Sequence, residues 1–220
     1  MRYPFPLVIF DLDGTLVDSL SDISEALNLT LADLALPQFD EATVRGWVGE
    51  GVRSLVASAL QASRSSLALD EVMPGFMRHY GECLLHHPRL YPGVAEALDG
   101  LQARAVTLAV CTNKPARFVQ PLLAHLGIAG HFSAVLGGDS LPQRKPDPTP
   151  LLHLCAQFGQ SAQQCLMVGD SAVDAAAANA AHVPLALVRY GYLRGLDPRH
   201  SGARWVMDDM RELLAIDTAG

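Results

Sequence analysis

Short runs of apolar residues recur along the chain, and each is followed by polar or glycine residues. The first run covers residues 7–10. Similar runs cover residues 106–111, 134–136, 165–168 and 185–188. A short continuous apolar run is typical of a strand that is buried on both faces of a parallel sheet. We therefore predict five strands at these positions.

The segments between these runs repeat their apolar residues at helical spacing. One set at positions i, i+3, i+4 and i+7 comprises Val94, Ala97, Leu98 and Leu101. A second set with the same spacing comprises Val119, Leu122, Leu123 and Leu126. Strands that alternate with helices form a parallel sheet that is covered on both faces. The pattern predicts an α/β fold with a Rossmann-like parallel sheet, whose functional side chains gather at the carboxyl ends of the strands.

Residues 19–87 interrupt this alternation, because no convincing strand pattern occurs there. Capping residues and apolar spacing predict helices instead. They begin near residues 19, 40, 52 and 70, and the last one ends near His86. The segment therefore reads as a purely helical insertion.

Domain boundaries follow from this interruption. We interpret residues 17–88 as an all-helical cap that is inserted after the first strand. Residues 1–16 and 89–220 then form the α/β core. The two connections, residues 16–18 and 88–93, are expected to act as hinges.

Composition narrows the range of partners. The chain has 220 residues, of which 50% are hydrophobic, and a formal net charge of −7 at pH 7. Such a chain has no electrostatic footprint for nucleic acid or an anionic membrane. Its four cysteines form no C-x-x-C pair and have apolar neighbours, which predicts buried free thiols in a reducing compartment. We expect a cytoplasmic monomer or homodimer that binds a small molecule, because no signal peptide or membrane span is evident.

Asp11 and Asp13 follow the first predicted strand. Residues two apart at a strand end point the same way, so both carboxylates can face one reacting centre. One carboxylate can attack phosphorus while the other protonates the leaving oxygen and later activates water. Thr15, after the turn at Gly14, offers a hydroxyl or amide to nearby oxygen atoms. A strand that ends in an ordinary Asp-Gly turn would show the same residues.

Two further polar clusters are weaker signals when taken alone. Thr112 and Asn113 follow the second strand and can hold a phosphate oxygen, although taken alone they fit a helix N-cap better. Lys145 lies in a segment stiffened by prolines and can neutralise an aspartate nucleophile and a phosphate. A single lysine is more often a surface residue.

Asp170 and Asp174 complete the set. Asp170 lies at the end of a strand, and Asp174 lies in the first turn of the next helix. Together with Asp11 they would repel each other without a cation. Oxygen ligands from two elements suit Mg²⁺, so we expect a magnesium site here.

The four clusters occur in a fixed order at strand ends. In this order the chain resembles the haloacid-dehalogenase-like phosphatases along essentially its whole length, with their motifs at 11–15, 112–113, 145 and 169–174. The helical insertion resembles the cap of that family. The resemblance implies that Asp11 is the nucleophile, that Asp13 is the acid/base, and that Thr112 and Lys145 hold the phosphoryl group. The metal ligands that it implies are the side chains of Asp11 and Asp170, the backbone carbonyl of Asp13, and Asp174 directly or through water.

The cap segment indicates which branch of the family the chain resembles. Residues 44–51 resemble the cap loop of bacterial phosphoglycolate phosphatases, and Asp13 favours phosphomonoesters because dehalogenases and phosphonate hydrolases of the family lack an acid there. Glycines such as Gly49 let the backbone approach a ligand, and Arg45 or Arg53 can pair with a carboxylate. A plain glycine-rich helix junction fits the spacing equally well. The resemblance decides in favour of 2-phosphoglycolate as the substrate.

Other functions stay open at this point. A phosphatase for a sugar phosphate, such as N-acetylmuramic acid 6-phosphate, and a β-phosphoglucomutase-like phosphomutase share the core motifs. A non-catalytic binding module on the same fold is disfavoured by the intact Asp11, Asp13, Lys145 and Asp170.

One position departs from the family. His182 stands where the family usually has glycine at a left-handed helix end. Histidine tolerates that conformation better than most residues. We therefore expect a small effect on stability and none on catalysis.

Overall fold

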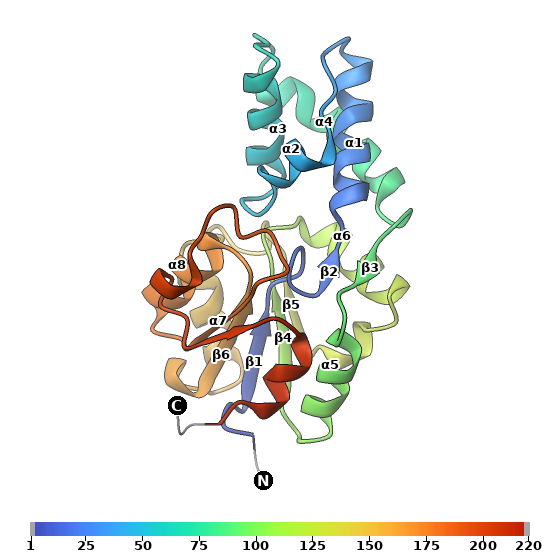
Figure 1. Ribbon diagram of the computed structural model, residues 1–220. Helices are drawn as coiled ribbons and strands as arrows, with labels where there is room; N and C mark the ends of the chain where they lie inside the picture. Colours follow the sequence, from blue (N-terminus) through green and yellow to red (C-terminus); the bar gives the residue numbers. More distant parts are fainter. Residues whose placement is uncertain (1–2, 218–220) are drawn as a thin grey trace.

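The structure is a computed structural model that describes residues 3–217. Its centre is a six-stranded parallel sheet with the order β5-β4-β1-β6-β7-β8 (Figure 1). The strands are β1 (Leu7–Phe10), β4 (Thr107–Cys111), β5 (Ala134–Leu136), β6 (Cys165–Gly169), β7 (Leu185–Val188) and β8 (Trp205–Met207). All five predicted strands are present. β1 lies between β4 and β6 in this order. Its carboxyl end is therefore in the middle of the sheet edge at which the polar residues gather.

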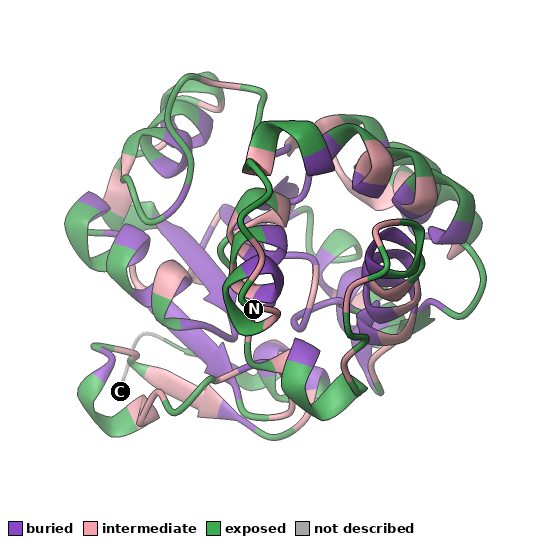
Figure 2. Ribbon diagram, turned by 90° about the horizontal axis from the view of Figure 1, so that it is seen from above, coloured by how far each residue is buried: buried purple, intermediate pink, exposed green. Residues whose placement is uncertain are grey.

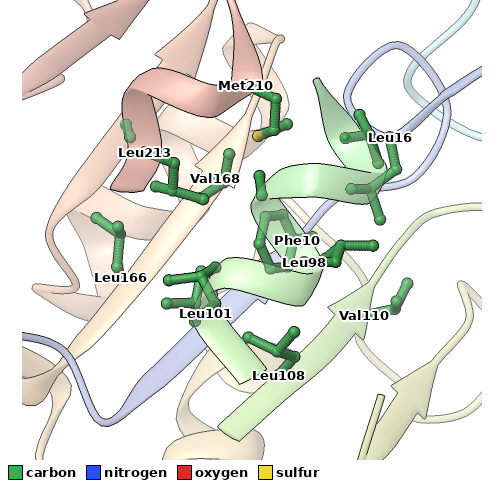
Figure 3. Close-up of a cluster of buried hydrophobic side chains, with 14 of the residues drawn as sticks. Phe10, Leu16, Leu98, Leu101, Leu108, Val110, Leu166, Val168, Met210 and Leu213 are labelled. Carbon is green, nitrogen blue, oxygen red and sulfur yellow. The ribbon is translucent and has the colours of Figure 1, made fainter. Parts of the chain in front are cut away.

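Helices cover both faces of this sheet, as predicted. They are α5 (Val94–Gln102), α6 (Ala116–His125), α7 (Thr149–Gln157) and α8 (Ala172–Ala181), with 3-10 turns η1 (Ala129–His131), η2 (Ala162–Gln164), η3 (Pro198–His200) and η4 (Met210–Ala215). Successive residues of β1 point to opposite faces. Val8 and Phe10 pack with α5, α6 and η4, part of which Figure 3 shows, while Leu7 and Ile9 pack with α7 and α8. All four side chains are fully buried, and burial of such a side chain contributes about 1.5–3 kcal/mol.

A second group of helices lies above the carboxyl edge of the sheet, at the top of Figure 1. It comprises α1 (Leu20–Asp33), α2 (Glu41–Arg45), α3 (Val52–Ala62) and α4 (Leu69–Cys83). These helices share a hydrophobic cluster of their own, which includes Leu27, Val56 and Phe76. Figure 2 shows helices whose buried stripes face inward and whose exposed stripes face outward. The cap is therefore a helical unit with its own core, inserted after β1 as predicted.

Two short strands carry the chain into and out of this cap. β2 (Val17–Asp18) pairs antiparallel with β3 (Arg89–Leu90). The pair coincides with the two segments that we expect to act as hinges. The domain division at residues 16/17 and 88/89 stays a prediction.

One local helix boundary was wrong. The last cap helix ends at Cys83 and not near His86, because the chain then turns and His87 donates its backbone N–H to Asp22 on α1 (2.8 Å). The first cap helix begins next to Ser19, whose hydroxyl donates to Asp13 (2.6 Å). Within residues 3–217, no helix has the length and apolar character needed to cross a membrane.

Candidate active site

The residues that follow β1 occupy the middle of the carboxyl edge. The backbone N–H of Asp11 donates to the carbonyl of Val168 (2.9 Å), which extends the pairing of β1 with β6 by one residue. Gly14 then turns the chain at a φ of +90°, and a side chain there would collide with Asp170. The turn brings Asp11 and Asp13 to the wall of one cavity, as predicted from their spacing.

The loop after β4 forms another part of this wall. The backbone N–H of Thr112 donates to the carbonyl of Leu136 (2.9 Å), so the start of the loop is fixed to β5. The side-chain amide of Asn113 donates to the carbonyl of Lys145 (2.9 Å) and to that of Gly49 in the cap (3.3 Å). Thr112, Asn113 and Gly49 all line the cavity. Thr112 and Asn113 thus line the same cavity as Asp11 and Asp13.

Lys145 is buried next to the predicted nucleophile. Its Nζ lies 3.0 Å from Asp11 Oδ1 and 2.6 Å from Asp174 Oδ1. Burial alone would lower the pKa of this lysine, but Asp11 and Asp174 outweigh that effect and raise its pKa. The ammonium therefore stays charged between two carboxylates.

The other two acidic residues are held by hydrogen bonds. Asp170 accepts from the hydroxyl of Thr15 (2.7 Å) and from the backbone N–H of Tyr192 (2.6 Å). Asp174 Oδ2 accepts from the hydroxyl of Ser171 (2.7 Å), in a capping box at the start of α8. Thr15, predicted to bind substrate, thus has its hydroxyl directed at Asp170.

The carboxylates of Asp11, Asp170 and Asp174 form a buried acidic cluster. Their ligand atoms all lie within 4.8 Å of one another. Burial raises the pKa of Asp11 to about 7, with Lys145 acting against it. Burial, followed by Asp174 and Asp11, also raises the pKa of Asp170 well above its ordinary value. A hard divalent cation would offset this cost, and an all-oxygen donor set suits one.

The part of the chain that carries these four clusters matches a known family. A model of the haloacid dehalogenase-like hydrolases matches residues 5–182. The chain belongs to this family. The family and the hydrolase class predicted from the order of the motifs are confirmed.

Relatives of this hydrolase match nearly its full length. The phosphoglycolate phosphatase of Haemophilus influenzae is 44% identical over 223 residues, which cover 98% of this chain and 100% of that protein. That of Rhodospirillum rubrum is 46% identical over 214 residues, or 94% of this chain and 88% of that protein. The crystal structure of a predicted phosphoglycolate phosphatase from Haemophilus somnus has a TM-score of 0.92 at 41% identity, covering 98% of this chain and 99% of that chain. The predicted α/β fold is confirmed by this similarity.

The cap of this hydrolase closes the cavity with an apolar wall. Four aliphatic side chains form it, namely Ile23, Val48, Val52 and Leu55. Two polar cavity residues, Lys114 and Tyr80, were not predicted as site residues. Lys114 Nζ lies 2.9 Å from Asp13 Oδ1 and also donates to the hydroxyl of Tyr80 on α4. No periodic or motif signal links these two positions, since they lie 34 residues apart.

The two cap arginines lie elsewhere. Arg45 donates to the carbonyl of Gly191 (2.8 Å) and to that of Tyr190 (3.2 Å), so it connects the cap to the core. Arg53 forms an exposed ion pair with Asp70 (2.7 Å). Neither arginine is among the residues that line the cavity. Their predicted contact with substrate stays a prediction.

Proposed function

We propose that this hydrolase converts 2-phosphoglycolate to glycolate and phosphate through an aspartyl-phosphate on Asp11. The observation that carries the proposal is the cavity itself, whose lining combines Asp11, Asp13 and Lys114 with an apolar wall from the cap. Such a space suits a short anionic ester. The names of the relatives from Haemophilus influenzae and Rhodospirillum rubrum support the same substrate.

The residues of the site can each take a defined role in this reaction. Asp11 attacks phosphorus, the bond from phosphorus to the ester oxygen breaks, and Asp13 protonates that oxygen so that glycolate leaves. Water then attacks the aspartyl-phosphate as Asp13 removes its proton, which releases phosphate and restores Asp11. Lys145, 3.0 Å from Asp11, neutralises negative charge throughout. Thr112 hydrogen-bonds the phosphoryl oxygens.

Asp13 is held in a position that suits both of its roles. Ser19 (2.6 Å) and Lys114 (2.9 Å) both donate to its Oδ1. Among the hydrogen bonds of residues 3–217, none reaches Oδ2, so this oxygen is left to exchange protons with the leaving group and with water. Fixing one oxygen and leaving the other unengaged orients the acid without neutralising it.

We also propose Mg²⁺ as the cofactor, held by Asp11, Asp170, the backbone carbonyl of Asp13, and Asp174. Asp174 Oδ1 accepts from Lys145 and its Oδ2 from Ser171, and this residue would contact the cation directly or through water. When bound, the cation would stabilise negative charge on the phosphoryl oxygens. Activity should vanish in excess chelator and return with Mg²⁺, and Mg²⁺ should raise the melting temperature. Full activity after exhaustive chelation would rule the cofactor out.

The substrate is tested by phosphate release from a panel of esters in Mg²⁺. We expect kcat/KM to be highest for 2-phosphoglycolate, compared with hexose 6-phosphates, N-acetylmuramic acid 6-phosphate and nucleoside monophosphates. If a larger ester is preferred by tenfold, about 1.4 kcal/mol of transition-state preference, the substrate proposal fails. Isomerisation of a hexose phosphate with little phosphate release would instead indicate a phosphomutase.

The proposed setting is the cytoplasm, where the protein would act on a small phosphomonoester as a monomer or homodimer. All four cysteines are buried free thiols, which fits a reducing compartment.

A further inference from the structure

The charged and the apolar residues of the cavity lie on opposite sides of it. Its core side carries the carboxylates of Asp11 and Asp13, whereas its cap side is aliphatic apart from Tyr80. Lys114 is the only cationic side chain among the residues that line it. The phosphoryl group is already served by Lys145, which is bound to Asp11 and Asp174. Lys114 lies instead beside Asp13, with its Nζ 2.9 Å from Asp13 Oδ1.

Lys114 is held between the core and the cap. Its side chain is 1% exposed, and its Nζ donates to Asp13 Oδ1 in the core and to Tyr80 Oη in the cap. Tyr80 is itself fixed by packing against Phe76 and Phe118, with ring centroids at 5.5 and 4.9 Å. A lysine ammonium has three N–H donors. Two of them are engaged, so one is left for a ligand in the cavity.

The position of Asp13 fixes where a carboxylate would lie. Asp13 protonates the ester oxygen, and in 2-phosphoglycolate the carboxylate is attached to the next carbon. A side chain that binds this carboxylate must therefore lie beside Asp13. Lys114 Nζ, 2.9 Å from Asp13 Oδ1, satisfies this condition. The aliphatic cap wall keeps water away and strengthens the attraction between ammonium and carboxylate.

The two arginines that were predicted to pair with the substrate carboxylate are engaged elsewhere. Arg45 is hydrogen-bonded to the carbonyls of Tyr190 and Gly191, and Arg53 is paired with Asp70 at the surface. We infer that Lys114 is the specificity-determining residue that binds the carboxylate of the substrate, with the Tyr80 hydroxyl as its positioning partner. This inference rests on the proposed function.

The test compares two esters of equal length. One is 2-phosphoglycolate, and the other is 2-hydroxyethyl phosphate, in which an uncharged hydroxymethyl group replaces the carboxylate. Lys114→Met should lower kcat/KM for 2-phosphoglycolate by about 100-fold more than for 2-hydroxyethyl phosphate, because it removes one charged hydrogen bond from a buried site. If the substitution acted only by disturbing Asp13, kcat/KM would fall by the same factor for both esters. An unchanged ratio of the two kcat/KM values would overturn the inference.

Two more variants sharpen the result. Tyr80→Phe keeps the aromatic ring but removes the hydroxyl, and it should lower the same ratio by a smaller factor. Arg78→Met on the same helix removes an exposed cation paired with Asp33, and it should leave the ratio unchanged. If Lys114→Met does not fold, Lys114→Gln takes its place.

The wild-type enzyme separates the two proposals. If the wild type does not prefer 2-phosphoglycolate over 2-hydroxyethyl phosphate, the proposal of 2-phosphoglycolate as the substrate is wrong. The inference that Lys114 binds its carboxylate is then wrong as well. Should the wild type show the preference while Lys114→Met retains it, only the role of Lys114 fails.

Discussion

At the scale of single residues, Asp11 combines a buried carboxylate with a close ammonium. Asp11→Asn removes the nucleophile but keeps the volume, so turnover should fall by at least about 10,000-fold. The variant should remain folded, because it replaces a buried carboxyl whose pKa burial has raised to about 7. Phosphate release and thermal unfolding measure the two effects. A rate close to that of the wild type would end the covalent mechanism.

Asp22 on α1 gives a prediction about pH. Its Oδ1 accepts from the backbone of His87, whereas its buried Oδ2 has no hydrogen-bond partner among residues 3–217. Burial raises the pKa of Asp22, and the nearby His87 only partly counteracts it. A carboxyl with a raised folded-state pKa stabilises the protein at low pH, and this contribution is lost as pH rises through that pKa.

Asp22→Asn, which stays neutral, should therefore raise the melting temperature at pH 7.5 relative to the wild type. The gain should be a few degrees, since about 1 kcal/mol corresponds to about 2–4 °C in a chain of this size. The difference should shrink toward pH 4. Melting curves at both pH values check this, and a variant that is less stable at pH 7.5 would contradict it.

Several residues of the site were predictable, and others were not. Asp11, Thr112 and Asp170 each follow a strand, and parallel strands bring their carboxyl ends to one edge. The pairing of Lys114 with Tyr80 depends on how the cap rests on the core, which no local pattern encodes. The same holds for Arg45, whose guanidinium forms hydrogen bonds with backbone carbonyls of a distant loop.

At the scale of elements, α8 ends in a residue that is not glycine but has a left-handed backbone conformation. His182 has a φ of 54° and a ψ of 34°, the left-handed conformation that was predicted for this helix end. A residue with a Cβ pays for this conformation, whereas glycine does not. His182→Gly should stabilise the protein by about 0.5–1 kcal/mol, while His182→Val should destabilise it. Thermal unfolding of both variants tests this, with kcat expected to stay unchanged; equal melting temperatures would contradict it.

Three short strands, β2, β3 and β8, were not predicted. β8 has three residues at the edge of the sheet, and β2 and β3 have two each, so none is long enough to show a period. The longer buried strands and the amphipathic helices were predictable because burial imposes a repeating pattern on them. The cap helices were predicted in number, and their ends shifted by a few residues where local turns intervened.

At the scale of the whole molecule, the cap and the core are joined in a closed arrangement. The cavity has a volume of about 30 Å³, and one water molecule needs about 10–15 Å³ on the same scale. This space is small for a phosphorylated substrate, so we expect the cap to move away from the core to admit it. Contacts such as the Arg194–Glu50 ion pair (2.9 Å) must open during this motion.

We predict that ligand-free protein in solution samples open states and that a phosphate analogue with Mg²⁺ closes it. Small-angle X-ray scattering should show a smaller radius of gyration after the analogue is added. Arg45→Ala, which removes two hydrogen bonds between cap and core, should increase the radius of the ligand-free form. Identical scattering with and without the analogue would exclude gating by the cap.

The antiparallel pair of β2 and β3 has a consequence for how such enzymes diversify. Since the chain leaves the core and returns to it through adjacent strands, the entire cap is topologically one enlarged loop. Recombination that exchanges the segment between these strands leaves the register of β1 against β4 and β6 untouched. A lineage can thus exchange the cap wall of the cavity in one genetic event while it inherits the core residues, Lys114 among them.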